Sequence, residues 1–285
     1  MNLRFSLLFR VLTISLSLLF FKNNGHCMDN LLVVQWGDDT LYQVDATDGS
    51  IIHAIPGPGS TSMNSMAIGS NGFVYVGDSD QIWSFDTSNL SWSIFSDQVS
   101  TTGVRGLAYL DSGIRSQGNS LITATLGFRS TSFHEYDIDS GNINFLGVIL
   151  DEYFQGLSNN STVSSSNIYG SRNDDSSSPA FTSINLNSLS SGSEISMERL
   201  YQSVELYEGN FYGAEQSTIY DISFSDDSPL ITVEGLGDIR GFGFYSIPDS
   251  AFVPEPTSYA LMLNLLVGTL LFVRSNRPKS KDSGR

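Results

Sequence analysis

The segment Ile82-Trp83-Ser84-Phe85-Asp86 carries the pattern that decides the fold. An apolar residue, two variable residues and a second apolar residue are followed by a polar one. The other copies are Leu41-Tyr42-Gln43-Val44-Asp45, Phe133-His134-Glu135-Tyr136-Asp137, Phe181-Thr182-Ser183-Ile184-Asn185 and a weaker Ile219-Tyr220-Asp221-Ile222-Ser223. Their last positions, 45, 86, 137, 185 and 223, are spaced by 41, 51, 48 and 38 residues. The alternation predicts a strand in each copy, and the closing polar residue predicts a turn.

Short apolar segments flank each copy. The strands expected directly before the copies are Leu31–Val34, Phe73–Val76, Leu121–Ala124, Ile168–Tyr169 and Phe211–Tyr212. The strands expected before those are Met66–Ile68, Gly106–Tyr109, Gly156–Ser158, Val204–Leu206 and Gly241–Phe244. Strands after the copies include Trp92–Phe95, Asn144–Ile149 and Leu230–Val233. Four strands per repeat at this period predict the blades of a β-propeller.

The two ends of the repeat region complement each other. The region begins with Leu31–Val34, a strand of the kind that directly precedes a copy and is the second of a repeat. It finishes with Gly241–Phe244, a strand of the kind that begins a repeat. We therefore expect an all-β domain over 28–249, a propeller of five four-stranded blades closed by a C-terminal strand that joins the N-terminal blade. The domain resembles secreted propellers with degenerate YVTN- or PQQ-type repeats. A β-sandwich or jelly roll is the alternative fold.

Two polar stretches interrupt the pattern in the fourth blade. Residues 159–178 are rich in Ser, Asn and Asp, and residues 187–197 are rich in Ser. Both are expected to be long loops.

The charge balance limits the partners. The chain has 285 residues, and segment 28–252 holds 28 acidic residues against six arginines and no lysine, so its net charge is −22. A surface this negative repels phosphate backbones, and nucleic acid is not an expected partner.

The N-terminus reads as a signal peptide over 1–27. Arg4 and Arg10 provide the positive start, Val11–Phe21 is an apolar run of 11 residues, and Gly25-His26-Cys27 offers a cleavage site. Lipidation of Cys27 is the alternative interpretation. Because Cys27 is the only cysteine, cleavage after it leaves a mature chain without disulfides or thiol catalysis.

The C-terminal segment 250–285 carries a motif at 253–258 that includes Pro254, Glu255 and Pro256, an apolar stretch at 259–273 and a basic tail at 274–285. This order resembles the PEP-CTERM sorting signal of Gram-negative bacteria. The resemblance implies processing by an exosortase, export across the inner membrane with transient membrane anchoring, and an association with exopolysaccharide and biofilm. An ordinary membrane anchor is the alternative.

Few residues suggest catalysis. The sequence contains no HExxH, CxxC, GxSxG or P-loop motif. His134 occupies a packing position of the repeat, and His53 is expected to be exposed on an outer strand. Five-bladed propellers include glycosidases with carboxylates at the starts of the inner strands, but only Asp238 is acidic there. We expect a protein that is not an enzyme, with a carbohydrate-active hydrolase or lyase as an alternative.

The starts of the expected inner strands suggest a binding site instead. Arg105-Gly106 and Arg240-Gly241 align, and the corresponding residues of the other blades are Asn64, Gln155 and Gln202. Two guanidinium groups beside amides could hold a uronate-bearing sugar. The competing interpretation is that each arginine pairs with a nearby acid such as Asp238.

Two weaker candidates complete the search. Asp137 and Asp139 precede Gly141 in the manner of a calcium loop, although the same spacing is ordinary turn chemistry, and no other cofactor is expected. Trp36 ends a strand and is the best placed of the three tryptophans to stack on a sugar. The expected function is therefore a non-catalytic binding or structural protein of the cell surface or matrix, interacting with exopolysaccharide. A protein–protein interaction scaffold is a further alternative.

Overall fold

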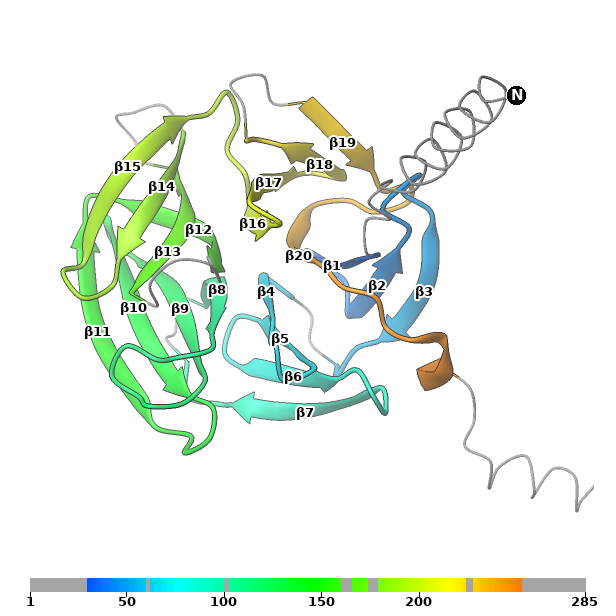
Figure 1. Cartoon of the computed structure of the whole chain (residues 1–285), viewed down its shortest axis with the longest axis horizontal. Helices are drawn as coiled ribbons and strands as arrows, with labels where there is room; N and C mark the ends of the chain where they lie inside the picture. Colours follow the sequence, from blue (N-terminus) through cyan, green and yellow to red (C-terminus); the bar gives the residue numbers. More distant parts are fainter. Residues whose placement is uncertain are drawn as a thin grey trace, which may run out of the picture.

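The computed structural model describes residues 30–59, 62–99, 103–159, 166–173, 179–223 and 228–252. These residues form five four-stranded antiparallel sheets that stand as blades around a central axis (Figure 1). The structure is a five-bladed β-propeller, as the repeat predicts, and the sandwich alternative is excluded.

Each blade places its four strands at increasing distance from the axis. The innermost strands are β4 (Ser65–Ile68), β8 (Val104–Leu110), β12 (Tyr153–Asn159), β16 (Ser203–Tyr207) and β20 (Ile239–Phe244). The second strands are β1 (Leu31–Gln35), β5 (Phe73–Gly77), β9 (Ser120–Gly127), β13 (Asn167–Asn173) and β17 (Asn210–Glu215). The third strands are β2 (Thr40–Val44), β6 (Ile82–Asp86), β10 (Ser130–Asp137), β14 (Ala180–Asn185) and β18 (Thr218–Asp221). The outer strands are β3 (Ile51–Pro56), β7 (Ser91–Ser96), β11 (Ile143–Leu150), β15 (Ser190–Ser196) and β19 (Ser228–Thr232).

The C-terminal strand closes the ring. β20 pairs antiparallel with β1, with Leu31 opposite Phe244 and Val34 opposite Gly241. The first blade is therefore built from both ends of the propeller, as expected from the order of strand types. Closure leaves neither β1 nor β20 as an unpaired edge at this junction.

The repeat positions have distinct physical roles. The first position is buried in every copy, with at most 2% of the side chain exposed at Leu41, Ile82, Phe133, Phe181 and Ile219. In the first four copies the closing side chain accepts the backbone N–H two residues later, as Asp86 Oδ1 does from Ser88 at 2.8 Å. This bond ends the strand in a turn. The fifth copy departs from the pattern, since the Ser223 hydroxyl accepts the N–H of Phe211 instead, at 2.8 Å.

The hydrophobic core lies between the blades. Five clusters of buried side chains are present in the described residues, and each joins two neighbouring blades. Phe133 and Phe154, for example, meet across the seam between the third and fourth blades, with ring centroids 6.0 Å apart. The apolar side chains thus hold neighbouring blades together. The inner strands line the central axis.

The fourth blade corrects two sequence-based expectations. Residues 187–197 were expected to form a loop, but β15 occupies Ser190–Ser196 and pairs with β14. Within 159–178, β13 spans Asn167–Asn173, so the predicted strand Ile168–Tyr169 is present but longer than expected. Almost the whole of β15 is exposed, so its serines have no apolar partners to reveal the strand by alternation. Backbone pairing forms this strand without a hydrophobic face.

The described chain ends on the propeller. A 3₁₀ helix, η1 (Asp249–Phe252), packs its Ala251 and Phe252 against the seam between the first and second blades. The Phe252 ring stacks on His53 at 3.7 Å, so His53 is partly covered, contrary to its expected exposure. The signal peptide, the motif Pro254-Glu255-Pro256 and the apolar stretch lie outside the described residues. Within the described ranges, no helix has the length and apolar character needed to cross a membrane.

Candidate functional site

Strand register gives the five inner strands a common level. In each blade, the second residue of the repeat, on the third strand, pairs with a residue of the neighbouring second strand. That residue pairs in turn with one residue of the innermost strand. Those inner residues are Met66, Leu107, Leu157, Val204 and Phe242. Two positions before them stand Asn64, Arg105, Gln155, Gln202 and Arg240, which we call the upper ring. The upper ring lies on the face where the inner strands begin, the upper face, and the opposite side is the lower face.

Both arginines of the upper ring stand on β-bulges. The register between β8 and β9 shifts between Val104 and Gly106, which leaves Arg105 as the extra residue. The same shift between Ile239 and Gly241 leaves Arg240 unpaired in the ladder. A bulge re-aims the side chain that it carries. Each arginine side chain is therefore partly exposed although the residues on either side of it are buried.

Arg240 is fully engaged with its neighbours. Its Nε donates to Asp238 Oδ2 at 2.8 Å, and its Nη2 forms a second bond to the same oxygen. Its Nη1 donates to Gln202 Oε1 at 2.8 Å, which links the first and fifth blades. Arg240 therefore forms a structural ion pair with Asp238.

Arg105 differs from Arg240 although the two positions are equivalent. Its guanidinium carbon lies 5.9 Å from the centre of the Trp36 ring, and that of Arg240 lies 5.1 Å from the same ring. Burial, and then the charge of Arg240, lower the pKa of Arg105 from its ordinary value. In the described part of the chain, Arg105 makes no ion pair or hydrogen bond. A half-buried cation stacked on an aromatic ring is thus left without an anion.

Trp36 reaches this site because of its place after β1. The backbone N–H of Trp36 donates to the backbone carbonyl of Asp238 at 2.8 Å, so Trp36 lies beside the start of β20, and it is 47% exposed. Sequence reasoning treated Trp36 as a separate loop candidate. The sequence does predict the pairing of β1 with β20. That pairing places Trp36, just after β1, beside Arg240 on β20, so it could have identified the two residues as one site.

Gln35 holds the two loops of the site together. Its Oε1 accepts the N–H of Gly237 at 2.6 Å, and its Nε2 donates to Asp38 Oδ2 at 2.8 Å. Asp38 also accepts the hydroxyls of Thr40 and Tyr42. Burial alone would raise the pKa of Asp38, but these donors hold it below its ordinary value. The loop with Trp36 is therefore fixed against the loop with Asp238.

The amides of the upper ring retain hydrogen-bonding capacity. Asn64 is 4% exposed, and its Oδ1 has no hydrogen-bond partner among the described residues. The side chain of half-buried Gln155 likewise makes no hydrogen bond within the described ranges. Asn64 Oδ1 is enclosed by the protein, so Arg105 and Gln155 are the ring members that could bind carboxylate and hydroxyl oxygens of a ligand.

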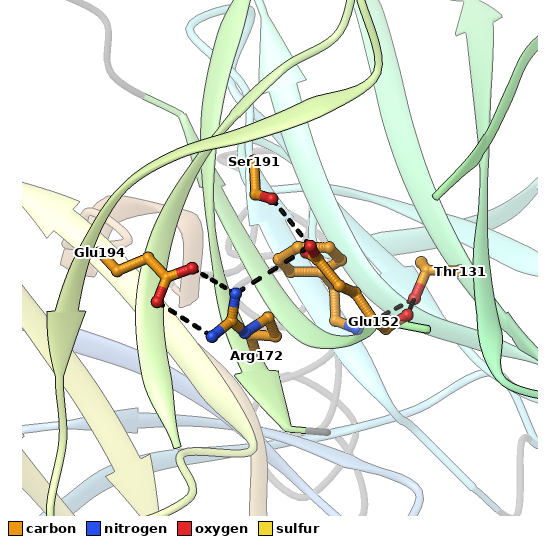
Figure 2. Close-up of polar contacts among 6 residues, drawn as sticks. Thr131, Glu152, Arg172, Ser191 and Glu194 are labelled. Carbon is orange, nitrogen blue, oxygen red and sulfur yellow. Dashed lines mark hydrogen bonds and ion pairs between the residues drawn. The ribbon is translucent and has the colours of Figure 1, made fainter. Parts of the chain in front are cut away.

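The other arginines have internal roles. Figure 2 shows Arg172, which is 8% exposed, paired with Glu194 through both terminal nitrogens, with Nη2 to Oε2 at 3.0 Å. Its Nη1 lies 4.0 Å from Glu152 Oε1, which also accepts the Ser191 hydroxyl (Figure 2). Arg115 donates to the carbonyls of Phe145 and Leu146. Arg129 pairs with Asp151 at 3.1 Å, and Arg199 pairs with Glu215 at 3.0 Å.

The remaining sequence candidates serve the turns and the surface. Asp137 Oδ1 accepts the N–H groups of Asp139 and Ser140, each at 3.0 Å, and these bonds lower the pKa of Asp137. Gly141 follows with a φ of +71°, which completes the turn. His134 is half-buried beside Phe145, and burial lowers the pKa of His134. The geometry at Asp137 is that of a hairpin turn.

One acidic group escaped the sequence search. Glu205 lies one position after Val204, and it lines a cavity of about 190 Å³ that extends to the lower face. Val204-Glu205-Leu206 reads as an ordinary alternating strand with Glu205 in solvent, so no sequence signal marks the residue.

The comparisons with known proteins show the fold alone. No protein-family model and no curated protein matches the chain. A chain of a nidogen/laminin complex is similar with a TM-score of 0.53 and 12% identity, over 75% of this chain and 97% of that chain. A protein of unknown function from Bacteroides caccae is similar with a TM-score of 0.46 and 12% identity, over 71% of each chain.

Proposed function

We propose that the protein is an exported, non-catalytic binding protein of the bacterial surface, and that its upper ring binds an anionic, hydroxyl-rich polymer such as a uronate-bearing exopolysaccharide. The observation that carries the proposal is Arg105. Among the six arginines of the described chain, it alone has no oxygen partner, in a domain of strongly negative charge.

The chemistry of the upper ring suits a sugar acid. A guanidinium group binds a carboxylate with two parallel hydrogen bonds, and a tryptophan face packs against the apolar face of a sugar ring. Arg105 and Trp36 supply both groups side by side. Half-buried Gln155 adds a hydrogen-bonding group for hydroxyls. Because Gln35 and Asp38 already fix the Trp36 loop, binding orders little of the protein.

The carboxylates of this region support binding without cleavage. Asp238 is held by Arg240, and Asp38 is held by Gln35, Thr40 and Tyr42. A glycosidase needs one carboxyl group to protonate the leaving oxygen and a second to attack or activate water. Neither aspartate is free for such a role.

The location rests on the sequence of the two ends. The signal peptide and the PEP-CTERM-like segment support export followed by transient anchoring. Tyr245 follows β20 at the lower face and contacts Thr87, with the two hydroxyls 3.1 Å apart, before the chain continues to Phe252. The last described residue, Phe252, stacks on His53 in the middle of β3, the outer strand of the first blade.

A protein-interaction scaffold is the second candidate. The third blade exposes Phe128 (95%) and Leu150 (72%). Both lie at the same end of its sheet, because Leu150 pairs with Ser130 and Phe128 is in the turn just before Ser130. Large apolar groups exposed together suit a protein partner more than a glycan.

Binding of polygalacturonate to the purified full chain, followed by tryptophan fluorescence, tests the proposal. Dextran is the neutral comparison, and Arg129→Ala is the matched control, since Arg129 lies on the upper face outside the ring and is paired with Asp151. We expect saturable binding of polygalacturonate that Arg105→Ala weakens about tenfold or more. Arg129→Ala should leave it within about twofold.

Two results would overturn the proposal. Equal binding of dextran and polygalacturonate would remove the role of the carboxylate. Binding that Arg105→Ala leaves unchanged would place the ligand elsewhere. Shortening of the polymer during the incubation would instead favour the hydrolase or lyase alternative.

A further inference from the structure

The lower half of the central axis carries a second ring of equivalent residues. One position after the common level stand Ala67, Ala108, Ser158, Glu205 and Gly243, which we call the lower ring. Four of them are small, and Glu205 alone has a long side chain. A Cβ added to Gly243 would lie 3.8 Å from Glu205 Oε1, an ordinary van der Waals distance, so Gly243 is a direct neighbour of the carboxyl group.

The cavity beside the lower ring is small, and polar and apolar atoms share its surface about equally. It has a volume of about 190 Å³, and its walls come from four of the five inner strands and the turns that follow them. The apolar part of the surface includes Leu107, Leu157 and Leu206. The polar groups are Glu205, Ser158 and, towards the lower face, Ser70, Tyr109 and Asp111. A pocket that combines apolar walls with polar groups suits a small organic molecule that has both an apolar body and a charged end.

Glu205 has little internal compensation. Its Oε2 accepts the hydroxyl of Ser158 at 3.3 Å, and its Oε1 has no partner among the described residues. Burial raises the pKa of Glu205 to about 8. The titratable groups that share its cavity are Tyr109 and Asp111, and both are neutral or negative rather than cationic. The Ser70 hydroxyl lies between them, hydrogen-bonded to Asp111 and 3.3 Å from the Tyr109 hydroxyl.

We propose that this cavity binds a small primary ammonium compound, with its nitrogen on the Glu205 carboxylate and a short apolar body against Leu107 and Leu157. An ammonium group would supply the missing positive charge and fill the vacant hydrogen bond of Oε1. The described chain contains no cluster of three His, Cys, Asp or Glu residues that could hold a metal ion, which favours an organic cation. The inference is independent of the proposed glycan site on the upper face.

The proposed site predicts a definite pH dependence. At pH 7 Glu205 must lose a proton before it can pair with an ammonium group, whereas at pH 9 it is already ionised. Alkylammonium groups resemble lysine, with a pKa near 10.4, and remain charged at both values. Affinity should therefore rise about tenfold from pH 7 to pH 9.

Calorimetric titration of the full chain with n-butylammonium tests the inference. We expect one saturable site per chain, binding that is about tenfold tighter at pH 9, and proton release at pH 7. Glu205→Gln should lower the affinity at least tenfold, because it keeps the shape and removes the charge. Glu234→Gln, at an exposed position, is the matched control and should have no effect.

Three arms of the experiment can overturn the inference. Equal binding of n-butanol would show that the cavity selects apolar shape and not charge. Calcium that binds at the same site and displaces n-butylammonium would replace the organic cation with a metal ion. Absence of n-butylammonium binding at pH 9, or binding that Glu205→Gln leaves unchanged, would remove the site.

Discussion

Glu135 is fully buried and Glu205 is partly buried, and their hydrogen-bonding surroundings are opposite. Glu135, on β10, is 0% exposed, and its oxygens accept the N–H of Ile114 at 2.6 Å, the N–H of Arg115 at 2.9 Å and the hydroxyl of Ser116 at 3.1 Å. Glu205, on β16, has the Ser158 hydroxyl alone, at 3.3 Å. The first carboxylate replaces its lost hydration with protein donors, and the second does not.

This difference separates a structural acid from one that is available to a ligand. Donors that point at a buried carboxylate compensate its desolvation, so Glu135 fixes the loop between β8 and β9. A partly buried carboxylate with a single, long hydrogen bond stays destabilised as an anion until a proton or a cation reaches it. Burial by itself therefore does not identify a functional acid. The hydrogen-bond partners of the acid do.

The largest effect that we expect is the pH dependence caused by Glu205. Its pKa is about 8 in the folded chain and about 4.5 when unfolded, so the folded state binds more protons between these values. Its contribution is fully favourable below pH 4.5, and the free energy of unfolding falls as pH rises to 8. The loss between pH 5 and pH 9 should be about 4 kcal/mol. Urea unfolding at pH 5 and pH 9 measures it.

The variant Glu205→Gln isolates this contribution. Glutamine resembles the protonated acid, so the variant should match the parent at pH 5 and exceed its stability at pH 9. Comparing the change with pH in the two proteins cancels the titration of all other groups. Parallel pH profiles would contradict the assignment of a raised pKa to Glu205.

The second effect tests the other member of the comparison. Glu135→Ala leaves the N–H groups of Ile114 and Arg115 without their acceptor, so we expect a loss of about 3 kcal/mol in the free energy of unfolding at pH 7. Exposed Glu234→Ala should change it by less than about 0.5 kcal/mol. Limited proteolysis should show faster cleavage near residues 112–119 in Glu135→Ala. An unchanged unfolding midpoint would mean that the loop is held without this carboxylate.

The sequence contains enough information for the fold and for the level of the upper ring. Both follow from the repeat, because its alternation defines the strands and its equivalent positions define a common register. Four closing residues act as turn caps, as expected for Asp and Asn. The exposed β15 escapes detection because nothing buries its side chains.

Contacts between blades are harder to predict. Trp36 lies near Arg105 although 69 positions separate them in the chain, because the ring brings the first and third blades to one centre. Glu205 and Ser158 meet for the same reason. Glu135 and Glu205 look alike as single residues within strands, and only the donors contributed by other segments distinguish them.

The smallest effect applies the same distinction to cations. Arg240→Met should lower the free energy of unfolding by about 1 kcal/mol, because Asp238 and Gln202 lose their partner. Arg105→Met should raise it by about 0.5 kcal/mol, since the change removes a half-buried cation that Arg240 repels. Urea unfolding of both single variants and of the double variant at low salt measures the coupling. The gain from Arg105→Met should shrink once Arg240 is absent, because part of it comes from that repulsion. A loss of stability in Arg105→Met would show that Arg105 makes stabilising interactions, as Arg240 does. The distinction between charges with and without partners would then not apply to the upper ring.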